Sequence, residues 1–438
     1  MAKSGFRCIL KRSLIAFCVL AQSSFSLAHV PQLVLYYPDW QIYQKASPVL
    51  SELAIDNATH LVYAFLAVCG PVTHSSENIQ QLMEKRCAGK PIGHVVVLDE
   101  HAALKANLRG NTSHQTYYRG NFGQLKYLKE QNPDLTIIAS IGGWTLSEPF
   151  HTVTANQQYQ ANMIRSIRAL LKKYPFFGGV QINWEYPGGY GLSGLGLNER
   201  ESEKQGYTQL LHGVRAELDK LGNEMLSSYE LSITYNASQK HRGSIDWPKV
   251  SPLLSTVYLM SYDYHGPWRN IVGHHTNLHE TPLTPEGLSV SSQVQHLLEQ
   301  SIPATKILIG SPFYGRGWKG VDNVSENNLE ALTAKEIDGL SSSLTESGFI
   351  RYNDLSQHFL GNEENGFVYF YDQQAEAAVL YNPASKDYIT FESPRSAKAK
   401  ATYVNQQQLG GMFIWEVTAD HQNQLLDAIS SGLESSPQ

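Results

Sequence analysis

Eight short β-rich runs recur along this chain, and longer segments with helical periodicity lie between several of them. The helical segments include Ala161–Tyr174 and Ser202–Leu221. Strands that alternate with helices favour a parallel sheet, and eight such strands predict an α/β fold, a closed (β/α)8 or TIM barrel. The runs are Leu33–Tyr37, His60–Leu66, Thr136–Ile141, Gly179–Trp184, Glu230–Tyr235, Thr256–Ser261, Lys306–Pro312 and Gly411–Trp415.

Two intervals between these runs are too long for simple connections. Residues 67–135, between the second and third runs, hold two cysteines and are expected to extend the rim of the barrel. Residues 315–392, between the seventh and eighth runs, hold further β-like pieces such as Gly366–Tyr371. We therefore predict a small α+β domain at 315–392, inserted into a barrel made of residues 29–314 and 393–438.

The N-terminus has the pattern of a secretory signal peptide. Four basic residues and no acidic residue lie in the first 12 positions, and the apolar run Ser13–Ala21 follows. That run is too short to span about 30 Å of hydrocarbon, which argues against the alternative of a membrane anchor. Ser26-Leu27-Ala28 supplies a small-x-small cleavage site, so residues 1–28 are the predicted signal peptide. The mature chain is expected to be secreted, either outside the cell or in the periplasm.

The charge of the chain argues against one class of partner, the nucleic acids. The net charge is -6 and no run of Lys or Arg follows residue 12, which argues against binding to nucleic acid. No further segment approaches the length of a membrane span, and we expect a monomer.

Once the signal peptide is removed, Cys69 and Cys87 remain in an oxidising compartment, and we predict that they form a disulfide. The pair His274-His275 has no third ligand at a supporting spacing, so no metal site and no cofactor are expected.

The fourth run carries the first candidate for chemistry. Its alternation places Gln181, Asn183 and Glu185 on one face, opposite an apolar face that should contact the helices. In such a barrel the active site lies at the carboxyl ends of the strands. Glu185 at this end is a candidate general acid, because partial burial raises the pKa of a carboxyl group. The alternation alone equally allows a Glu that pairs with a structural Arg.

Five motifs resemble those of glycoside hydrolase family 18, the chitinases. The run FGGVQINWEYP from Phe177 to Pro187 resembles the family signature D-G-x-D-x-D-W-E-[YF]-P. The other four are SIGGW at Ser140–Trp144, MSYD at Met260–Asp263, YGRGW at Tyr314–Trp318, and Trp415-Glu416. They stand in the family's order at the expected strand ends, YGRGW opening the family's insertion domain. The likeness to the bacterial chitinase A type covers nearly the whole mature chain.

The strand-four motif departs from the family pattern. Gly178, Gln181 and Asn183 stand where the family has aspartates, and only Glu185 matches its carboxylates. The resemblance implies substrate-assisted retaining hydrolysis, in which Glu185 protonates the glycosidic oxygen and the substrate's own acetamido carbonyl attacks the anomeric carbon. Asn183 can accept the acetamido hydrogen bond but supplies no negative charge. A related family of endo-N-acetylglucosaminidases resembles this arrangement and works with an Asn–Glu pair.

The resemblance also assigns the substrate-holding residues. Tyr262 would donate to the acetamido carbonyl, Asp263 would bind the acetamido group or the sugar, and Met260 would pack beneath it. Tyr314 and Arg316 would contact neighbouring sugars. Four tryptophans are expected to stack on sugar rings, whereas Trp184 and Trp247 are expected to be packing residues. The stacking residues are Trp40, Trp144, Trp268 and Trp415.

The motifs are consistent with two functions of different classes, an enzyme and a binding protein. The first is a secreted, chitinase-like hydrolase of β-1,4-linked N-acetylglucosamine polymers or oligomers, with reduced activity. The second is a catalytically inactive lectin-like protein that binds chitin or chito-oligosaccharides. Retention of Glu185 and of most substrate-holding residues favours the enzyme. A third possibility, a protein that binds a partner protein through the barrel rim, has no supporting motif.

Overall fold

The structure is a computed structural model. It describes Met1 and residues 30–438 except 45–47, 110–118, 336–347, 362 and 436–438. The predicted signal peptide and its cleavage site therefore lie outside the described residues, apart from Met1.

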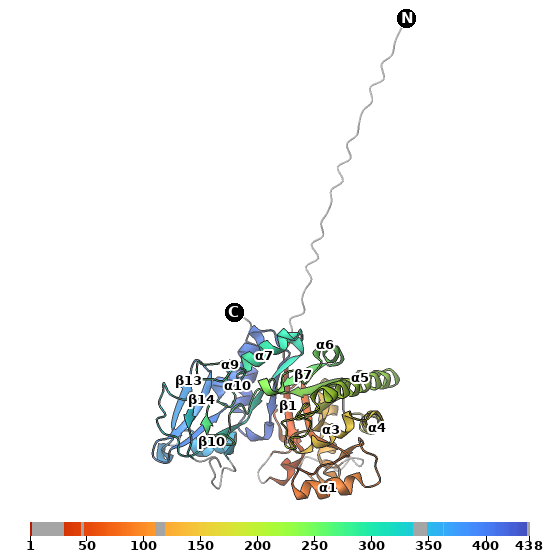
Figure 1. The fold of residues 1–438 in the computed structure, drawn as a ribbon, viewed down its shortest axis with the longest axis horizontal. Coiled ribbons are helices and arrows are strands. Elements are labelled where there is room, and N and C mark those ends of the chain that lie inside the picture. The colour runs from red at the N-terminus through yellow and green to blue at the C-terminus, as the bar shows by residue number, and fades with distance from the viewer. Residues whose placement is uncertain (2–29, 45–47, 110–118, 336–347, 362, 436–438) are drawn as a thin grey trace. The chain divides into compact units, whose positions relative to one another are not determined.

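A parallel barrel forms the core of the chain from Pro31 onward. Its eight strands pair in the order β1-β16-β9-β7-β6-β5-β4-β2, and a further pairing of β1 with β2 closes the sheet. Figure 1 shows the chain with β1 and β7 labelled among these strands. All eight runs expected from the sequence are strands of this barrel, which confirms the predicted α/β fold. The strands are β1 (Gln32–Pro38), β2 (His60–Val68), β4 (Thr136–Gly142), β5 (Gly179–Asn183), β6 (Glu230–Tyr235), β7 (Thr256–Leu259), β9 (Ile307–Pro312) and β16 (Gly411–Trp415).

Helices cover the outside of the barrel, and the sequences of α4 and α9 carry clear start signals. The N-cap Asn156 of α4 accepts hydrogen bonds from two backbone N–H groups of the first turn. Ser393 caps α9 in the same way, with Pro394 in the first turn, where a missing N–H costs nothing. None of the described helices is long and apolar enough to cross a membrane. The helices are α1 (Glu77–Cys87), α2 (Gly120–Gln131), α3 (Glu148–Thr154), α4 (Gln157–Lys173), α5 (Arg200–Met225), α6 (Trp247–Val250), α7 (Val290–Glu299), α8 (Tyr352–Asp354), α9 (Pro394–Gln406) and α10 (Gln424–Glu434).

Strand β5 shows how alternation sorts its side chains. Val180 and Ile182, with Trp184 just beyond the strand, join the large apolar core between the sheet and the helices. Gln181 and Asn183 are buried on the opposite side, inside the barrel. Trp184 and Trp247 are both buried, as expected of packing residues. The polar face of β5 therefore points into the barrel, as the sequence predicted.

The interval between β9 and β16 forms a separate antiparallel sheet. Its order is β12-β10-β15-β14-β13, and a second small sheet pairs β8 with β11. This arrangement confirms the small α+β insertion, while its exact limits at 315 and 392 stay a prediction. The strands are β10 (Tyr314–Trp318), β12 (Phe349–Arg351), β13 (Val368–Asp372), β14 (Ala377–Asn382) and β15 (Asp387–Phe391), with β8 (Ile271–Val272) and β11 (Leu332–Thr333) in the small sheet.

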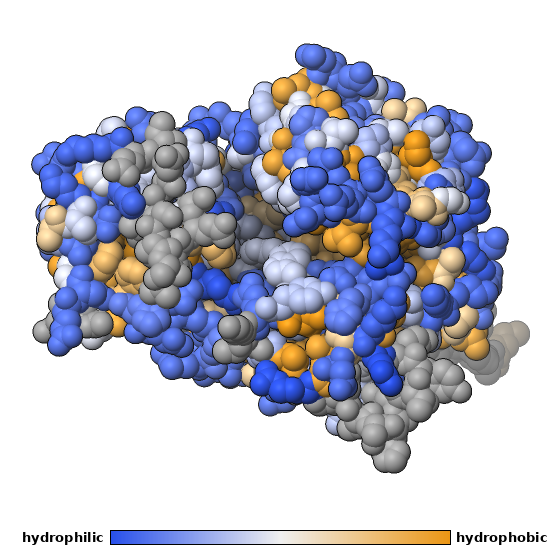
Figure 2. Space-filling model, turned by 90° about the horizontal axis from the view of Figure 1, so that it is seen from below, coloured by the Kyte–Doolittle hydropathy of each residue, from blue (hydrophilic) through white to orange (hydrophobic). Residues whose placement is uncertain are grey.

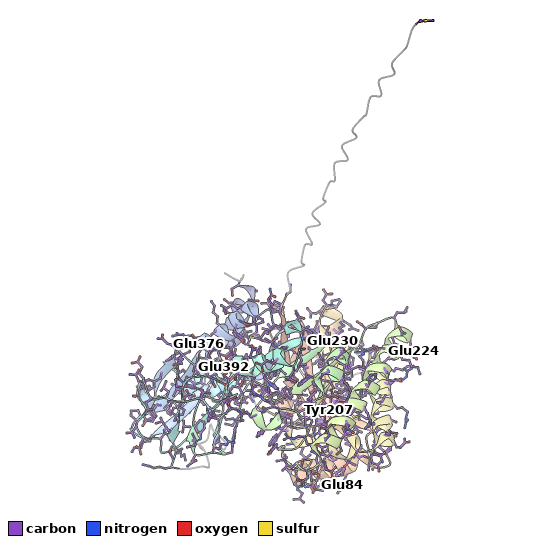
Figure 3. All side chains as sticks on the ribbon, turned by 45° about the horizontal axis from the view of Figure 1, so that its top comes forward. Glu84, Tyr207, Glu224, Glu230, Glu376 and Glu392 are labelled. Atoms are coloured by element: carbon purple, nitrogen blue, oxygen red, sulfur yellow. A yellow bond between two sulfur atoms is a disulfide. The ribbon has the colours of Figure 1, made fainter. Side chains whose placement is uncertain are left out.

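A buried ion pair holds the point where the chain returns to the barrel. Glu392 directly follows β15 and is labelled in Figure 3, and Lys400 lies on α9. The Lys400 Nζ and the Glu392 Oε2 are 2.6 Å apart, and both side chains are fully buried. Ser311 of β9 donates a further hydrogen bond to the same carboxylate. The network joins the inserted sheet, the barrel and α9, and it satisfies both buried charges.

The interval 67–135 extends the rim, as expected. Strand β3 (Val95–Val97) pairs antiparallel with β2, α1 lies beside it, and Cys69 is bonded to Cys87. The predicted disulfide is therefore present.

Removal of this bridge should destabilise the protein. Replacing both Cys69 and Cys87 by serine is expected to lower the free energy of unfolding by about 3 kcal/mol, because a loop of this size no longer constrains the unfolded chain. Urea unfolding of the oxidised wild type and the double variant measures the difference. Under reducing conditions the two proteins should unfold at nearly the same urea concentration. An equal stability of the two under oxidising conditions would contradict the expectation.

Candidate active site

A cavity of about 660 Å³ lies where the barrel strands end. Figure 2 looks onto this face of the molecule and shows a hollow near its centre. All eleven site residues expected from the sequence line this one cavity. They are Trp40, Trp144, Asn183, Glu185, Met260, Tyr262, Asp263, Trp268, Tyr314, Arg316 and Trp415.

Glu185 lies two residues after the end of β5 and is half-buried in the cavity wall. Its backbone N–H donates to Ser147 Oγ at 2.8 Å, which holds the end of the strand in place. Burial, together with repulsion from Asp263, raises the pKa of Glu185 to about 8. Within the described chain no Lys, Arg or His nitrogen lies within ion-pair distance of this carboxyl group, unlike Glu416, which pairs with Arg351. The alternative of a structural Glu–Arg pair therefore finds no support at Glu185.

Asn183 is held by a hydrogen bond that suits a carboxylate equally well. Thr234 Oγ1, on β6, donates to Asn183 Oδ1 at 2.5 Å. The Asn183 side chain is buried and lies two residues before Glu185 on the same face of β5. An aspartate at this position would accept the same bond and would add a negative charge to the cavity.

Gln181 lies deeper in the barrel and is fully buried. Its Oε1 accepts hydrogen bonds from the Tyr36 hydroxyl at 2.6 Å and from Ser140 Oγ at 2.9 Å. Its Nε2 group has no partner in the described part of the chain. A buried amide donor without a partner costs about 1–3 kcal/mol, and Gln181 bears this cost at its Nε2 group.

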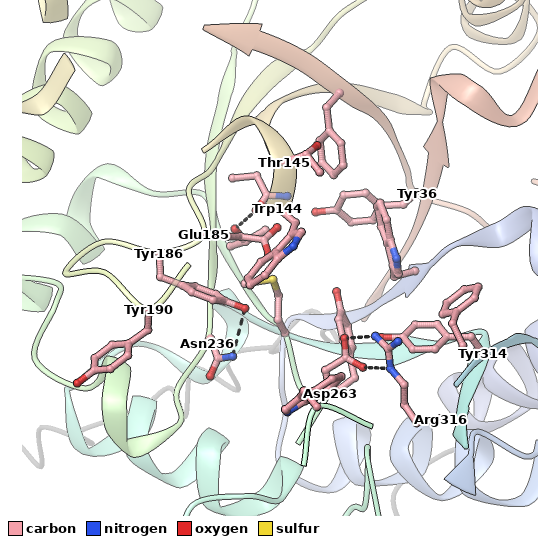
Figure 4. A pocket seen from close by; sticks show the side chains of 18 of the residues that line it. Tyr36, Trp144, Thr145, Glu185, Tyr186, Tyr190, Asn236, Asp263, Tyr314 and Arg316 are labelled. Atoms are coloured by element: carbon pink, nitrogen blue, oxygen red, sulfur yellow. Dashed lines mark hydrogen bonds and ion pairs between the residues drawn. The ribbon is translucent and has the colours of Figure 1, made fainter. Parts of the chain in front are cut away.

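Asp263 and Arg316 form the charged part of the site. The guanidinium donates two hydrogen bonds to the carboxylate, Nε to Oδ1 and Nη2 to Oδ2, each at 2.8 Å (Figure 4). Burial alone would raise the pKa of Asp263, but the Arg316 charge and the nearby His275 hold it well below its usual range. Asp263 therefore stays ionised, and its charge keeps the neutral form of Glu185 favoured.

Tyrosines lie around these charged groups and remain protonated. Burial raises the pKa of Tyr262 well above its ordinary value, so its hydroxyl is a hydrogen-bond donor at every physiological pH. Tyr186 lies in the wall beside Glu185, and Asn236 Nδ2 donates to its hydroxyl oxygen at 3.5 Å (Figure 4). Met260, just after β7, is buried and packs in the apolar cluster of the barrel interior.

Aromatic rings form much of the remaining surface. Trp40, Trp144 and Trp268 are 41%, 46% and 49% exposed, so their faces are open to a ligand. Trp415 stacks on Phe65 with ring centroids 5.6 Å apart, which fixes the orientation of the indole. The Arg316 guanidinium lies 5.2 Å from the Trp268 ring centroid. Flat rings that are held rigidly suit the C–H faces of sugars.

Nine further residues of the wall were not predicted from the sequence. Tyr36 and Thr234 lie on inward-facing positions of β1 and β6, so the alternation applied to β5 would have identified them. Tyr186 was visible as the residue after Glu185 in the strand-four motif. Neighbouring loops and the inserted sheet supply most of the others, which no periodicity marks. The nine are Tyr36, Phe65, Thr145, Tyr186, Tyr190, Thr234, Asn236, Lys240 and Phe349.

Comparison with known proteins gives one consistent result. Residues 32–420 match the family described as glycosyl hydrolases family 18. A chitinase of Autographa californica nuclear polyhedrosis virus is 32% identical over 403 residues, which are 90% of this chain and 71% of the viral protein. Chitinase A of Pseudoalteromonas piscicida is 31% identical over 429 residues, which are 91% of this chain and 52% of that protein.

Solved structures agree with the sequence relatives. Chitinase ChiA74 from Bacillus thuringiensis superposes with a TM-score of 0.82 at 29% identity, covering 93% of this chain and 70% of that one. A family 18 N-acetylglucosaminidase from Paenibacillus barengoltzii superposes with a TM-score of 0.70 at 26% identity, covering 92% of this chain and 99% of that one. The family match covers most of the chain and the viral chitinase is 32% identical, so the chain belongs to glycosyl hydrolase family 18.

Proposed function

We propose that this protein is an exported glycosidase that hydrolyses β-1,4-linked N-acetylglucosamine polymers or oligomers slowly and with retention of configuration. The observation that carries the proposal is Glu185, a carboxyl group in the cavity wall with no ion-pair partner in the described chain and a pKa raised to about 8. Such a group is protonated at neutral pH and can donate a proton to a glycosidic oxygen. The disulfide fits an oxidising compartment outside the cytosol.

In this proposal the substrate supplies the nucleophile. Glu185 protonates the leaving oxygen while the acetamido carbonyl oxygen attacks the anomeric carbon, which breaks the glycosidic bond and forms a cyclic oxazolinium ion. Water then opens this ion, and the Glu185 carboxylate takes the proton back. Tyr262 holds the acetamido carbonyl through its hydroxyl, and the exposed tryptophans hold the neighbouring sugars.

Asn183 limits the rate in this scheme. Its carbonyl accepts a hydrogen bond but places no negative charge beside the developing cation. Loss of one preorganised electrostatic contact of this kind costs about 3 kcal/mol, or a factor of about 100 in rate. This expectation is the reason for proposing slow turnover.

The second candidate is a chito-oligosaccharide-binding protein without catalysis. Its support is the uncharged polar face of β5, where both Gln181 and Asn183 are amides. The binding surface needs no charge at either position, because the tryptophans and the Asp263–Arg316 pair supply the contacts. The two candidates differ only in whether Glu185 delivers its proton.

The configuration of the first product tests the proposed mechanism. Proton NMR during hydrolysis of chitohexaose at high enzyme concentration should show the β-anomer first, with the α-anomer appearing later by mutarotation. Attack by the substrate's own acetamido group requires this order. Initial formation of the α-anomer would show direct attack by water and would contradict the mechanism.

The pH dependence should follow the acid. The protonated form of Glu185 is active, so kcat/KM is expected to be level through neutral pH and to fall tenfold per pH unit above about 8. Replacing Asp263 by Asn removes the repulsion that raises the pKa of Glu185, and it should move this alkaline limb to lower pH. Initial rates on a chromogenic chito-oligosaccharide measure both profiles. If kcat/KM of the wild type began to fall near pH 5, this would contradict the assignment of Glu185 as the general acid.

A further inference from the structure

A second cluster of ionisable side chains lies outside the cavity, at the junction between the barrel loops and the inserted domain. His274 follows β8, Glu330 lies just before β11, and Asp372 ends β13. One ligand atom from each side chain lies within 4.8 Å of the other two. The pairing of β8 with β11 brings the first two segments together, since Leu332 lies opposite Val272.

The two carboxylates are held in fixed orientations by groups around them. Backbone N–H groups of Gln374 and Ala375 both donate to Asp372 Oδ1 at 2.9 Å, which leaves Oδ2 directed at His274. Thr281 Oγ1 donates to Glu330 Oε2 at 2.5 Å. Hydrogen bonds of this kind orient carboxylates that ligate metals.

In the described chain the only ion-pair contact of the two carboxylates is that of Asp372 with His274. Glu330 is only 4% exposed and His274 is fully buried, yet among the described residues no Lys or Arg nitrogen lies within ion-pair distance of Glu330 or Asp372. Buried carboxylates in proteins are paired with cations or bind metals. A divalent cation between the three side chains would balance the two carboxylates.

We propose that His274, Glu330 and Asp372 bind one divalent transition-metal ion of the zinc type. The His274 Nε2 and the Asp372 Oδ2 are 3.2 Å apart, close to the distance of about 3.3 Å between two ligands of a tetrahedral zinc ion. Glu330 supplies the third ligand, because one of its carboxylate oxygens lies within 4.8 Å of the ligand atoms of the other two residues. One imidazole with two carboxylates selects zinc-like ions over calcium, which prefers oxygen ligands only.

A route for the ion and a place for water are both present. Glu330 and Asp372 line an open cavity of about 440 Å³, together with Thr281, Tyr371 and Gln374. Water from this cavity can occupy the fourth position of the ion. The three ligands come from segments far apart in the chain, so the ion acts as a clamp that joins a barrel loop to the inserted sheet. The proposal is independent of catalysis at Glu185.

Titration of the full, untagged mature chain with Zn²⁺ tests the site. After treatment with a chelator, calorimetry should show one equivalent bound per chain, and Zn²⁺ should raise the melting temperature relative to the chelated protein. Asp372→Asn keeps an oxygen for both backbone N–H donors, Glu330→Gln keeps one acceptor for Thr281 and Thr284, and each variant removes one ligand charge. Each is expected to weaken Zn²⁺ binding by about a hundredfold or more. Asp56→Asn makes the same change at an exposed position outside the cluster and should bind as the wild type does.

Three results would overturn the proposal. The first is absence of saturable Zn²⁺ binding by the wild type. The second is equal Zn²⁺ affinity of the wild type and both cluster variants. The third is that Asp372→Asn lowers the melting temperature of the chelated protein while Zn²⁺ leaves the wild type unchanged, because a protonated His274 paired with Asp372 then accounts for the cluster. Retained chito-oligosaccharide binding by each variant shows that its barrel is folded, so a loss of Zn²⁺ affinity reports the site itself.

Discussion

Replacement of Asn183 by aspartate is expected to raise the turnover number on chito-oligosaccharides by about a hundredfold. The aspartate would accept the hydrogen bond that Thr234 now donates to Asn183 Oδ1, so its orientation is already prepared. Its negative charge would stabilise the oxazolinium ion that forms beside it. Initial rates with chitohexaose at saturating concentration measure the gain, which should appear in kcat and much less in KM.

The gain depends on the surroundings of the new carboxylate. A second variant, Gln181→Asp, would accept from Tyr36 and Ser140 and would remove the amide group that has no partner in the described chain. The two positions share one face of β5, so their effects are expected to be coupled. The double variant should lower the activation free energy of turnover by more than the sum of the two single changes. Asn107→Asp, at an exposed position, is the matched control and should leave kcat unchanged. A rate no higher in either variant would show that charge at β5 does not limit turnover.

Replacement of Glu185 by glutamine is the second large effect. It should lower kcat by a factor of about 100 to 10,000, because the amide cannot donate the proton that the leaving oxygen needs. Affinity for chitohexaose should stay within a few fold, since the exposed tryptophans and the Asp263–Arg316 pair are untouched. Single-turnover kinetics and calorimetric titration measure the two quantities separately.

A control variant separates catalysis from a general change of charge. Glu84→Gln alters an exposed carboxylate on α1 that does not line the cavity, and it should leave both kcat and affinity unchanged (Figure 3). If Glu185→Gln lost affinity and rate by the same factor, Glu185 would be a binding residue and not the acid.

The barrel could be predicted because each strand carries a local signal. Runs such as Thr136–Ile141 are short, apolar and β-branched, and the two long intervals stood out by length alone. The order of pairing inside the inserted sheet could not be predicted, because β10 pairs with β12 and β15 through contacts that leave no local pattern. Its partners are set by packing across the whole domain.

Most of the predicted site residues stand in motifs, and Trp40 and Trp268 were assigned by the wider resemblance. Glu185, Asp263 and Trp415 stand in motifs at strand ends, and the structure brings them into one cavity. The orienting hydrogen bond from Thr234, by contrast, depends on the register between β5 and β6, which the sequence does not reveal. The cluster of His274, Glu330 and Asp372 could not be predicted either, because the two carboxylates lie far from His274 in the sequence.

The most direct test of the account is product release from chitohexaose by the wild type at high enzyme concentration, with Glu185→Gln as the baseline. We predict slow release that is proportional to wild-type concentration and is absent in Glu185→Gln. If the wild type released product no faster than Glu185→Gln while both proteins bound chitohexaose, the result would contradict the glycosidase function. It would support the chito-oligosaccharide-binding function in its place.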